Sequence, residues 1–287
     1  EIAPKDAEAW NELAHALRFQ GQLVEAREAA ERALKLNPGL AAAWFNLGAV
    51  RVAQADAAGG IDAYHKALGL KPEFAEAWSN LGIALGGQGR RDEEIDAYRR
   101  ALAINPQLAM VWSNLGGALS EQGNSDEAID AYRRSTEIDP QLAQGWSNLG
   151  DALREAEQFD EATAACERAV ALDPGLAGAW NNLGAIRMER GEFHEAQSSL
   201  NRALELDPSL AQAWSNLGSA LRRLELVSEA ISAHTRATEL APDNHLWWRG
   251  LAHALRAGKR YADGVAALRR AISLQPLHAG IRADLIY

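Results

Sequence analysis

Several residue types are scarce in this 287-residue sequence, and each shortage excludes a class of structure or partner. The single cysteine, Cys166, cannot form a disulfide within the chain. No apolar run approaches the roughly 20 residues of a membrane helix, and residues 1–10 do not resemble a signal peptide. Positive charge is also scarce, because 29 lysines and arginines face 39 acidic residues. An acidic surface does not attract nucleic acid or anionic membranes. We therefore expect a cytoplasmic protein without nucleic-acid binding or membrane insertion.

The motifs of common enzymes are absent as well. The sequence contains no HExxH, CxxC, GxSxG or phosphate-binding glycine loop. Its seven histidines do not cluster at the helical spacing of metal ligands, and no nucleophile–base pattern is present. We therefore expect no catalytic residue, no metal site and no cofactor, and a chain that is not itself an enzyme.

What the sequence does contain is a repeat of 34 residues. All nine prolines follow one another at this step, and so do eight of the nine tryptophans, each followed three residues later by leucine. The prolines are Pro4, Pro38, Pro72, Pro106, Pro140, Pro174, Pro208, Pro242 and Pro276. The tryptophans are Trp10, Trp44, Trp78, Trp112, Trp146, Trp180, Trp214 and Trp248. This regularity indicates tandem copies of one structural unit.

Each copy is expected to form two helices. Counted from three residues before the tryptophan, positions 1–14 predict helix A and positions 17–30 predict helix B. Glycine at position 15 in several copies and proline at position 32 favour the ends of these helices. The copies are 7–40, 41–74, 75–108, 109–142, 143–176, 177–210, 211–244 and 245–278, with the end of a preceding repeat at 1–6 and the start of a further, truncated helix at 279–287. Both ends fall within a repeat, so we expect a piece of a longer protein.

The shared positions resemble the tetratricopeptide repeat. In the best-matching copy the resemblance is carried by Trp112, Leu115, Gly116, Ala128, Tyr132 and Pro140. It covers residues 7–278 and implies an all-α fold, a right-handed superhelical solenoid of antiparallel helix hairpins over 1–278, with the A helices lining the concave face. Independently of this resemblance, a lone hairpin cannot bury its own apolar side, so the hairpins must stack.

A row of asparagines occupies the outward side of helix A. At 100° per residue, positions 4, 7, 8 and 11 point to the core, and positions 2, 6, 9 and 13 point away from it. Position 6 is asparagine in six successive copies, namely Asn46, Asn80, Asn114, Asn148, Asn182 and Asn216. Asparagine is a mediocre helix former, so the row needs a reason. In one interpretation these carboxamides bind the backbone of an extended peptide. In the other, they bond within their own hairpin.

Two further features concern single positions. Glu121, Glu155 and Glu189 at position 13, with Asp151 at position 9, form a secondary groove set that favours a basic side chain in a partner, unless they are an ordinary solvated surface. Position 20 is alanine in most copies but glutamate in the third. There Glu94 must point outward or force helices A and B apart.

The asparagine row is also similar to the repeat region of O-linked N-acetylglucosamine transferases, in which such asparagines hold the substrate backbone. Nothing in the chain resembles the glycosyltransferase domain of that family. The resemblance implies a scaffold that binds proteins or extended peptides in its concave groove, as the substrate-recognition region of a larger protein. The alternatives are a free-standing scaffold for several partners and a self-associating module that stacks end to end without binding peptides in its groove.

Overall fold

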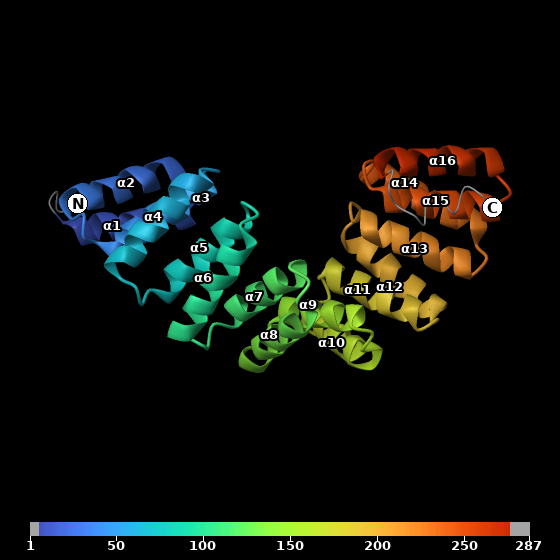
Figure 1. Cartoon of the computed structure of the whole chain (residues 1–287), viewed down its shortest axis with the longest axis horizontal. Helices are drawn as coiled ribbons and strands as arrows, with labels where there is room; N and C mark the ends of the chain where they lie inside the picture. Colours follow the sequence, from blue (N-terminus) through green and yellow to red (C-terminus); the bar gives the residue numbers. More distant parts are fainter. Residues whose placement is uncertain (1–5, 276–287) are drawn as a thin grey trace. The chain divides into compact units, whose positions relative to one another are not determined.

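The computed structural model describes residues 6–275, and this part of the chain contains sixteen α-helices and no strand (Figure 1). The A helices are α1 (Ala7–Phe19), α3 (Ala41–Ala53), α5 (Ala75–Gly86), α7 (Ala109–Glu121), α9 (Ala143–Glu155), α11 (Ala177–Glu189), α13 (Ala211–Arg223) and α15 (His245–Ala257). The B helices are α2 (Leu23–Leu36), α4 (Ala57–Leu70), α6 (Arg91–Ile104), α8 (Ser125–Ile138), α10 (Phe159–Leu172), α12 (Phe193–Leu206), α14 (Val227–Leu240) and α16 (Tyr261–Leu274). The predicted all-α fold of antiparallel hairpins is confirmed.

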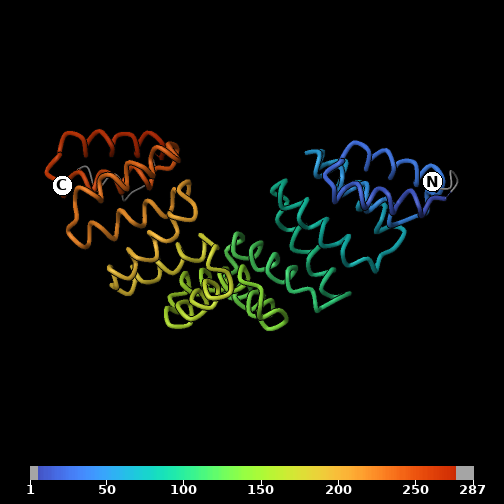
Figure 2. Tube along the Cα trace, turned by 180° about the vertical axis from the view of Figure 1, so that it is seen from behind, coloured from blue at the N-terminus to red at the C-terminus, as the bar shows by residue number. Residues whose placement is uncertain are grey.

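The hairpins group into two compact units, Glu1–Pro140 and Gln141–Tyr287, which we call unit 1 and unit 2. Unit 1 contains α1–α8, coloured blue to green, and unit 2 contains α9–α16, coloured yellow-green to red (Figures 1 and 2). Within each unit a B helix packs against its own A helix and against the next A helix. The predicted helix start at 279–287 lies outside the described residues, and one continuous solenoid over 1–278 stays a prediction.

The A helices form the inner side of each unit. In unit 1, α1 contacts α3, α3 contacts α5 and α5 contacts α7; in unit 2 the same holds for α9, α11, α13 and α15. Successive B helices of a unit make no contact of comparable extent. Because the A helices lie closer together than the B helices, each stack curves toward its A helices. We call the solvent-facing side of the A helices the inner face of a unit.

The apolar core is shared between neighbouring repeats. In unit 1, Leu34 of α2 packs in one cluster with Leu47 of α3 and Ala63 of α4. In unit 2, Leu204 of α12 packs with Leu217 of α13 in the same way. A hairpin on its own would expose these side chains, and burying apolar surface contributes about 25 cal/mol per Å². The stack is therefore the stable unit, as the repeat pattern predicts.

The tryptophan and proline series are joined by one hydrogen bond that crosses from each repeat to the next. The indole Nε1–H donates to the backbone carbonyl oxygen of the proline six residues earlier, at 2.8–3.1 Å. The pairs are Trp44–Pro38, Trp78–Pro72, Trp112–Pro106, Trp180–Pro174, Trp214–Pro208 and Trp248–Pro242. The rings are half-buried against the core. These tryptophans therefore link successive hairpins.

Glycine at position 8 of helix A lets helix B approach closely. In six copies, a Cβ placed on this glycine would lie 2.3–2.8 Å from the side chain at position 24. The pairs are Gly48–Tyr64, Gly82–Tyr98, Gly116–Tyr132, Gly150–Cys166, Gly184–Leu200 and Gly218–His234. Burial raises the pKa of the Cys166 thiol to about 12. This cysteine is therefore an inert part of the core.

The expectation for Glu94 is wrong, because this side chain is neither outward-pointing nor a wedge. Glu94 is 6% exposed, and its carboxylate occupies the space that Gly86 leaves on the facing helix. Arg91 Nη1 donates to Glu94 Oε2 at 2.5 Å, and Tyr98 also hydrogen-bonds to this carboxylate. Burial raises the pKa of the Glu94 carboxyl. A glycine and an ion pair thus make room for a charge between two helices.

The turn between helices A and B requires a left-handed residue at position 15. Four copies use glycine there, with φ of 71° to 88°. The other four place Ala55, Glu157, Glu225 and Lys259 in the same conformation, with φ of 58° to 64°. A left-handed conformation costs a non-glycine residue about 1–2 kcal/mol. The stack imposes this turn even where the local residue disfavours it.

Candidate functional site

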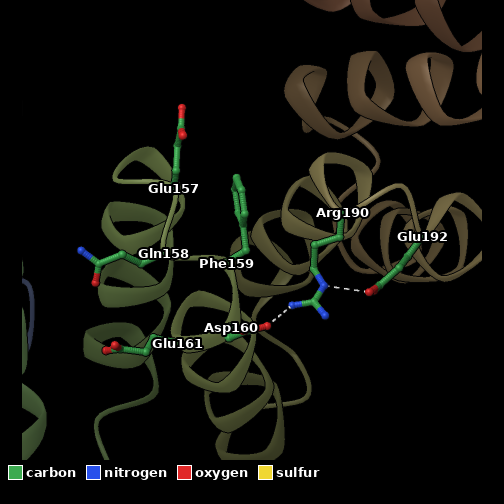
Figure 3. Close-up of a pocket in the computed structure, with 7 residues that line it drawn as sticks. All are labelled: Glu157, Gln158, Phe159, Asp160, Glu161, Arg190 and Glu192. Atoms are coloured by element: carbon green, nitrogen blue, oxygen red, sulfur yellow. Dashed lines mark hydrogen bonds and ion pairs between the residues drawn. The ribbon is translucent and has the colours of Figure 1, made fainter.

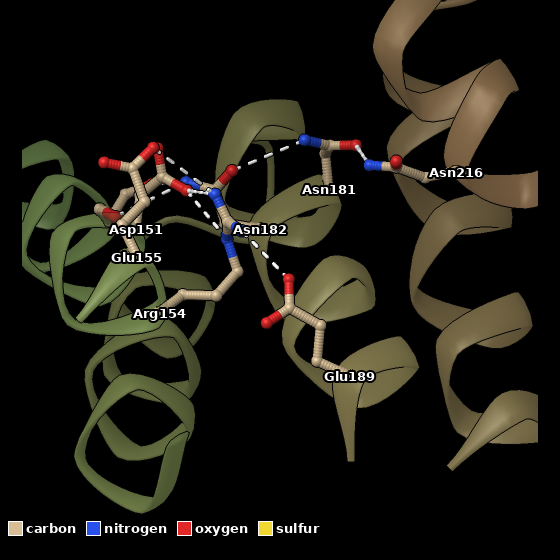
Figure 4. A network of polar contacts seen from close by, with 8 residues as sticks. Asp151, Arg154, Glu155, Asn181, Asn182, Glu189 and Asn216 are labelled. Atoms are coloured by element: carbon tan, nitrogen blue, oxygen red, sulfur yellow. Dashed lines mark hydrogen bonds and ion pairs between the residues drawn. The ribbon is translucent and has the colours of Figure 1, made fainter. Parts of the chain in front are cut away.

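The asparagines at position 6 bond mainly to a neighbouring repeat. Three of them donate Nδ2 to the residue at position 5 of the preceding A helix. Asn46 donates to Asn11 Oδ1 at 2.8 Å, Asn182 to Ser147 O and Oγ at 3.4 Å each, and Asn216 to Asn181 Oδ1 at 3.0 Å. These bonds tie adjacent A helices together, and Figure 4 shows those of Asn182 and Asn216 in unit 2. The sequence-based alternative of bonding within the same hairpin does not describe these three residues.

The other three asparagines differ from one another. Asn80 hydrogen-bonds to the hydroxyl of Tyr64 in the preceding repeat. Asn148 Oδ1 accepts a hydrogen bond from Gln144 Nε2 at 2.7 Å. Asn114 on α7 is half-buried and has no hydrogen-bond partner among residues 6–275. The row is therefore partly a set of links between helices, and only Asn114 presents an uncommitted carboxamide.

Accessibility separates the first asparagine from the rest. Asn46 is 3% exposed, enclosed between α1 and α3, and its Oδ1 has no partner among the described residues. The expectation that Asn46 faces an open groove is wrong, because its bond to Asn11 draws the amide into the helix contact. The remaining five are half-buried on the inner faces, Asn80 and Asn114 in unit 1 and Asn148, Asn182 and Asn216 in unit 2. Their contact with a peptide stays a prediction.

Three of the four predicted groove carboxylates gather around one arginine in unit 2 (Figure 4). Arg154 Nη2 lies 3.0 Å from Asp151 Oδ1 and 3.6 Å from Glu155 Oε1, and its Nη1 lies 3.0 Å from Glu189 Oε1. The guanidinium thus links α9 to α11. The three carboxylate side chains remain 40–53% exposed. Three carboxylates around one guanidinium leave this end of the inner face negative.

The fourth predicted carboxylate belongs to unit 1. Glu121 at the end of α7 forms an ion pair with Arg91 of α6, which also holds Glu94. Sequence reasoning missed both Arg91 and Arg154. Arginine is common on solvated helix surfaces, so its presence alone indicates no role. Arg91 and Arg154 each pair with a carboxylate on a neighbouring helix, which only the structure shows.

Sequence reasoning also missed a basic group at the other end of unit 2. Arg222 and Arg223 end α13, and Arg256 lies in the last turn of α15. All three are exposed, and none forms an ion pair with another described residue. The Arg223 guanidinium lies 4.8 Å from the centre of the Phe193 ring. The two ends of this unit therefore carry opposite charge.

The inner face of unit 1 is more apolar. Ile83 at position 9 of α5 is 50% exposed, and Met110 at position 2 of α7 is 56% exposed. In the same unit, Phe45 of α3 packs on Phe74 with ring centres 4.9 Å apart. This face suits a partner segment that presents apolar side chains.

Three surface hollows within residues 6–275 lack the properties of a chemical site. One of about 580 Å³ lies at the turns that follow α9 and α11 (Figure 3). There, Arg190 is already bonded to Asp160 Oδ1 at 2.5 Å and to Glu192 Oε1 at 2.7 Å, and the half-buried Phe159 is part of the lining. Two others, of about 440 and 400 Å³, lie on the outer side, each with a position-4 tryptophan in its lining. Their recurrence at matching repeat positions identifies them as products of hairpin stacking.

Within residues 6–275, no group of three His, Cys, Asp or Glu side chains is placed to hold a metal ion. None of the helices in this range has the length and apolar character of a bilayer-spanning segment.

The fold and the inner faces define a tandem-repeat scaffold of helical hairpins. Models of the tetratricopeptide repeat match residues 7–50, 46–109, 97–130, 114–177, 147–191, 175–243 and 225–279. The chain belongs to the tetratricopeptide repeat family. Proteins of this fold are generally non-catalytic scaffolds that bind other proteins or peptides. No curated protein matches the sequence.

Several solved structures share the fold. A chain of the APC/C hetero-tetramer Cut9–Hcn1 has 18% identity and a TM-score of 0.74, with 98% of this chain and 56% of that chain covered. YrrB, a TPR protein with an unusual peptide-binding site, has 22% identity and a TM-score of 0.56, with 65% and 96% covered. PilF of Pseudomonas aeruginosa has 18% identity and a TM-score of 0.65, with 72% and 94% covered. The chain thus spans 56% of the length of the first of these, and identities this low show the fold alone.

Proposed function

We propose that this chain is a protein–protein interaction scaffold whose inner faces hold extended segments of other polypeptides. The observation that carries the proposal is the row of five half-buried asparagines on the A helices. A carboxamide offers one acceptor and two donor hydrogens, which complement the C=O and N–H of an extended backbone. Asn216 uses one donor for Asn181, and Asn114 uses none within the described residues. The row therefore combines links between helices with groups that remain able to bind.

The spacing of the A helices suits an extended chain. Packed helices lie about 8–10 Å apart, and an extended chain advances about 3.3 Å per residue. One asparagine would then serve about three peptide residues, within each unit taken by itself. Each hydrogen bond contributes a net ~0.5–1.5 kcal/mol, and ordering a free peptide offsets much of this. Dissociation constants in the micromolar to millimolar range are therefore expected, with little dependence on peptide sequence.

The fold is compatible with this proposal, since YrrB, which shares it, has a peptide-binding site. The proposal extends to the place of the chain in a larger protein. The similarity of the asparagine row to the repeat region of O-linked N-acetylglucosamine transferases supports a substrate-recognition region beside a glycosyltransferase domain. Sequencing the full coding region tests this extension, and a coding region without such a domain refutes it while leaving the peptide-binding proposal intact.

The decisive test replaces Asn114 by alanine, because this substitution removes an inner-face carboxamide without breaking a bond between helices. A pool of unrelated extended peptides is titrated against each variant by fluorescence anisotropy, with circular dichroism as the check of folding. Loss of one hydrogen bond predicts about 2- to 12-fold weaker binding across the pool. Asn201→Ala is the matched control, because Asn201 lies exposed on the outer side of α12.

Two outcomes contradict the proposal. The first is equal binding by Asn114→Ala, Asn201→Ala and the unchanged protein. The second is the absence of binding at millimolar peptide concentration. If light scattering then shows association that increases with protein concentration, the self-associating module is the correct alternative.

A further inference from the structure

The charged side chains near the C-terminal ends of the A helices of unit 2 change in sign along the stack. At the α9–α11 end, Glu155 and Glu189 at position 13 are joined by Asp151, and Arg154 neutralises only part of their charge. The corresponding region of α13 and α15 carries Arg222, Arg223 and Arg256. The change of sign occurs between α11 and α13, two helices that pack directly against each other.

The basic end is not neutralised from within the unit. Glu225 lies in the turn directly after α13, yet neither it nor any other described acidic residue forms an ion pair with Arg222, Arg223 or Arg256. The acidic end is one or more helix spacings away, which is about 8–10 Å per step and comparable with the Debye length at physiological salt. Both charges therefore remain available to a ligand that spans the two ends.

The distance between the ends sets the length of such a ligand. Two helix steps separate the middle of the acidic end from the middle of the basic end, about 16–20 Å. An extended chain covers this distance in about five to six residues. On the peptide-binding function proposed above, we infer that the inner side of unit 2 selects extended segments with a basic residue and an acidic residue about six positions apart. The basic residue lies at the α9–α11 end and the acidic residue at the α13–α15 end.

The experiment compares peptides of equal length. One carries two lysines and two glutamates in separate pairs six residues apart, and a second has the reversed order along the chain. A third interleaves the same four residues, and a fourth has glutamine at all four places. Affinities are measured by anisotropy at 20 mM and 1 M salt, since exposed ion pairs weaken as salt rises. The better of the two separated peptides is expected to bind at least five-fold more tightly than the interleaved one at low salt, and equally at high salt.

Charge reversal then locates the contact. Arg222→Glu with Arg223→Glu is expected to remove the preference for the separated peptide. The control is Arg202→Glu with Arg236→Glu, at two residues exposed on the outer helices α12 and α14. This double substitution changes the net charge by the same amount. The control pair should retain the preference.

Three results overturn the inference. They are equal binding of the separated and interleaved peptides, equal loss of preference in both double variants, and a preference that persists at 1 M salt. Its failure is distinguishable from failure of the proposed function. Binding of the glutamine peptide without any charge preference refutes only the charge selection, whereas no binding of any peptide refutes both.

Discussion

A buried histidine in unit 2 makes the stability of its last hairpins depend on pH. His234 of α14 is 1% exposed and occupies position 24, which is tyrosine in three other copies. Its ring lies between Gly218 of α13 and Gly250 of α15, where an added Cβ would approach within 2.6 and 2.7 Å. Its Nδ1 has no hydrogen-bond partner among the described residues. Burial lowers the pKa of His234 to about 4, with further contributions from Arg222 of α13 and His253 of α15.

The sign and size of the effect follow from this pKa. A histidine in the unfolded chain titrates near 6.5, so the folded state disfavours the protonated ring. The stability that the neutral ring supports is fully present above pH 6.5 and is lost as the pH falls from 6.5 through about 4. Each unit of pKa difference corresponds to about 1.4 kcal/mol. At pH 5 the loss is therefore about 2 kcal/mol relative to pH 8.

The assay is native-state amide exchange read by mass spectrometry on peptides from α13 to α15, because a repeat stack need not unfold in one step. Protection relative to the intrinsic rate is expected to fall about 30-fold between pH 8 and pH 5, as 2 kcal/mol requires. The variant His234→Leu is the control, since Leu200 fills the same position of α12 against Gly184. It should show little of this fall. Equal losses in both proteins would refute the role of His234.

Further predictions concern the contacts between helices and the turns. Trp112→Phe removes the indole donor to the preceding proline carbonyl and should destabilise α7 and its neighbours by about 0.5–1.5 kcal/mol in amide exchange. Glu157→Gly relieves a residue with φ of 58° and should raise the unfolding midpoint in urea, with a gain of up to about 1 kcal/mol; a lower midpoint would contradict the assigned strain. Gly116→Ala places a Cβ 2.8 Å from the Tyr132 ring and should cost about 1–3 kcal/mol in urea unfolding, whereas Gly178→Ala, with open space around it, should cost nothing.

The helix ends could be predicted from sequence because they recur with the 34-residue period. Proline at position 32 acts locally in every copy, and glycine at position 15 does so in four copies, whereas in the other four the stack imposes the same turn on a residue that disfavours it. The bond of Asn182 to Ser147 depends on how one hairpin sits on the next, which no single repeat encodes. Its possible partners lie 35 residues away, and the helical period alone does not place them in contact.

The burial of Glu94 could have been predicted from a second exception in the same copy of the repeat. The third copy is the only one with glutamate at position 20, and it is also the only one with glycine at position 12. The structure joins these two exceptions, because the carboxylate of Glu94 fills the place of the missing side chain of Gly86. The larger residue at position 20 and the smaller residue at position 12 are therefore best interpreted together, because one fills the space that the other leaves on the facing helix.

The bond from tryptophan to proline bears on how such a chain lengthens or shortens in evolution. Its donor and acceptor stand six residues apart on either side of a repeat boundary. A duplication or deletion of 34 residues, wherever its breakpoints fall, recreates a tryptophan six residues after a proline. Each new repeat boundary therefore keeps the tryptophan–proline hydrogen bond without a further mutation. A change between the proline and the tryptophan whose length is not a multiple of 34 residues alters their spacing, so selection for a folded product favours arrays that grow in whole repeats.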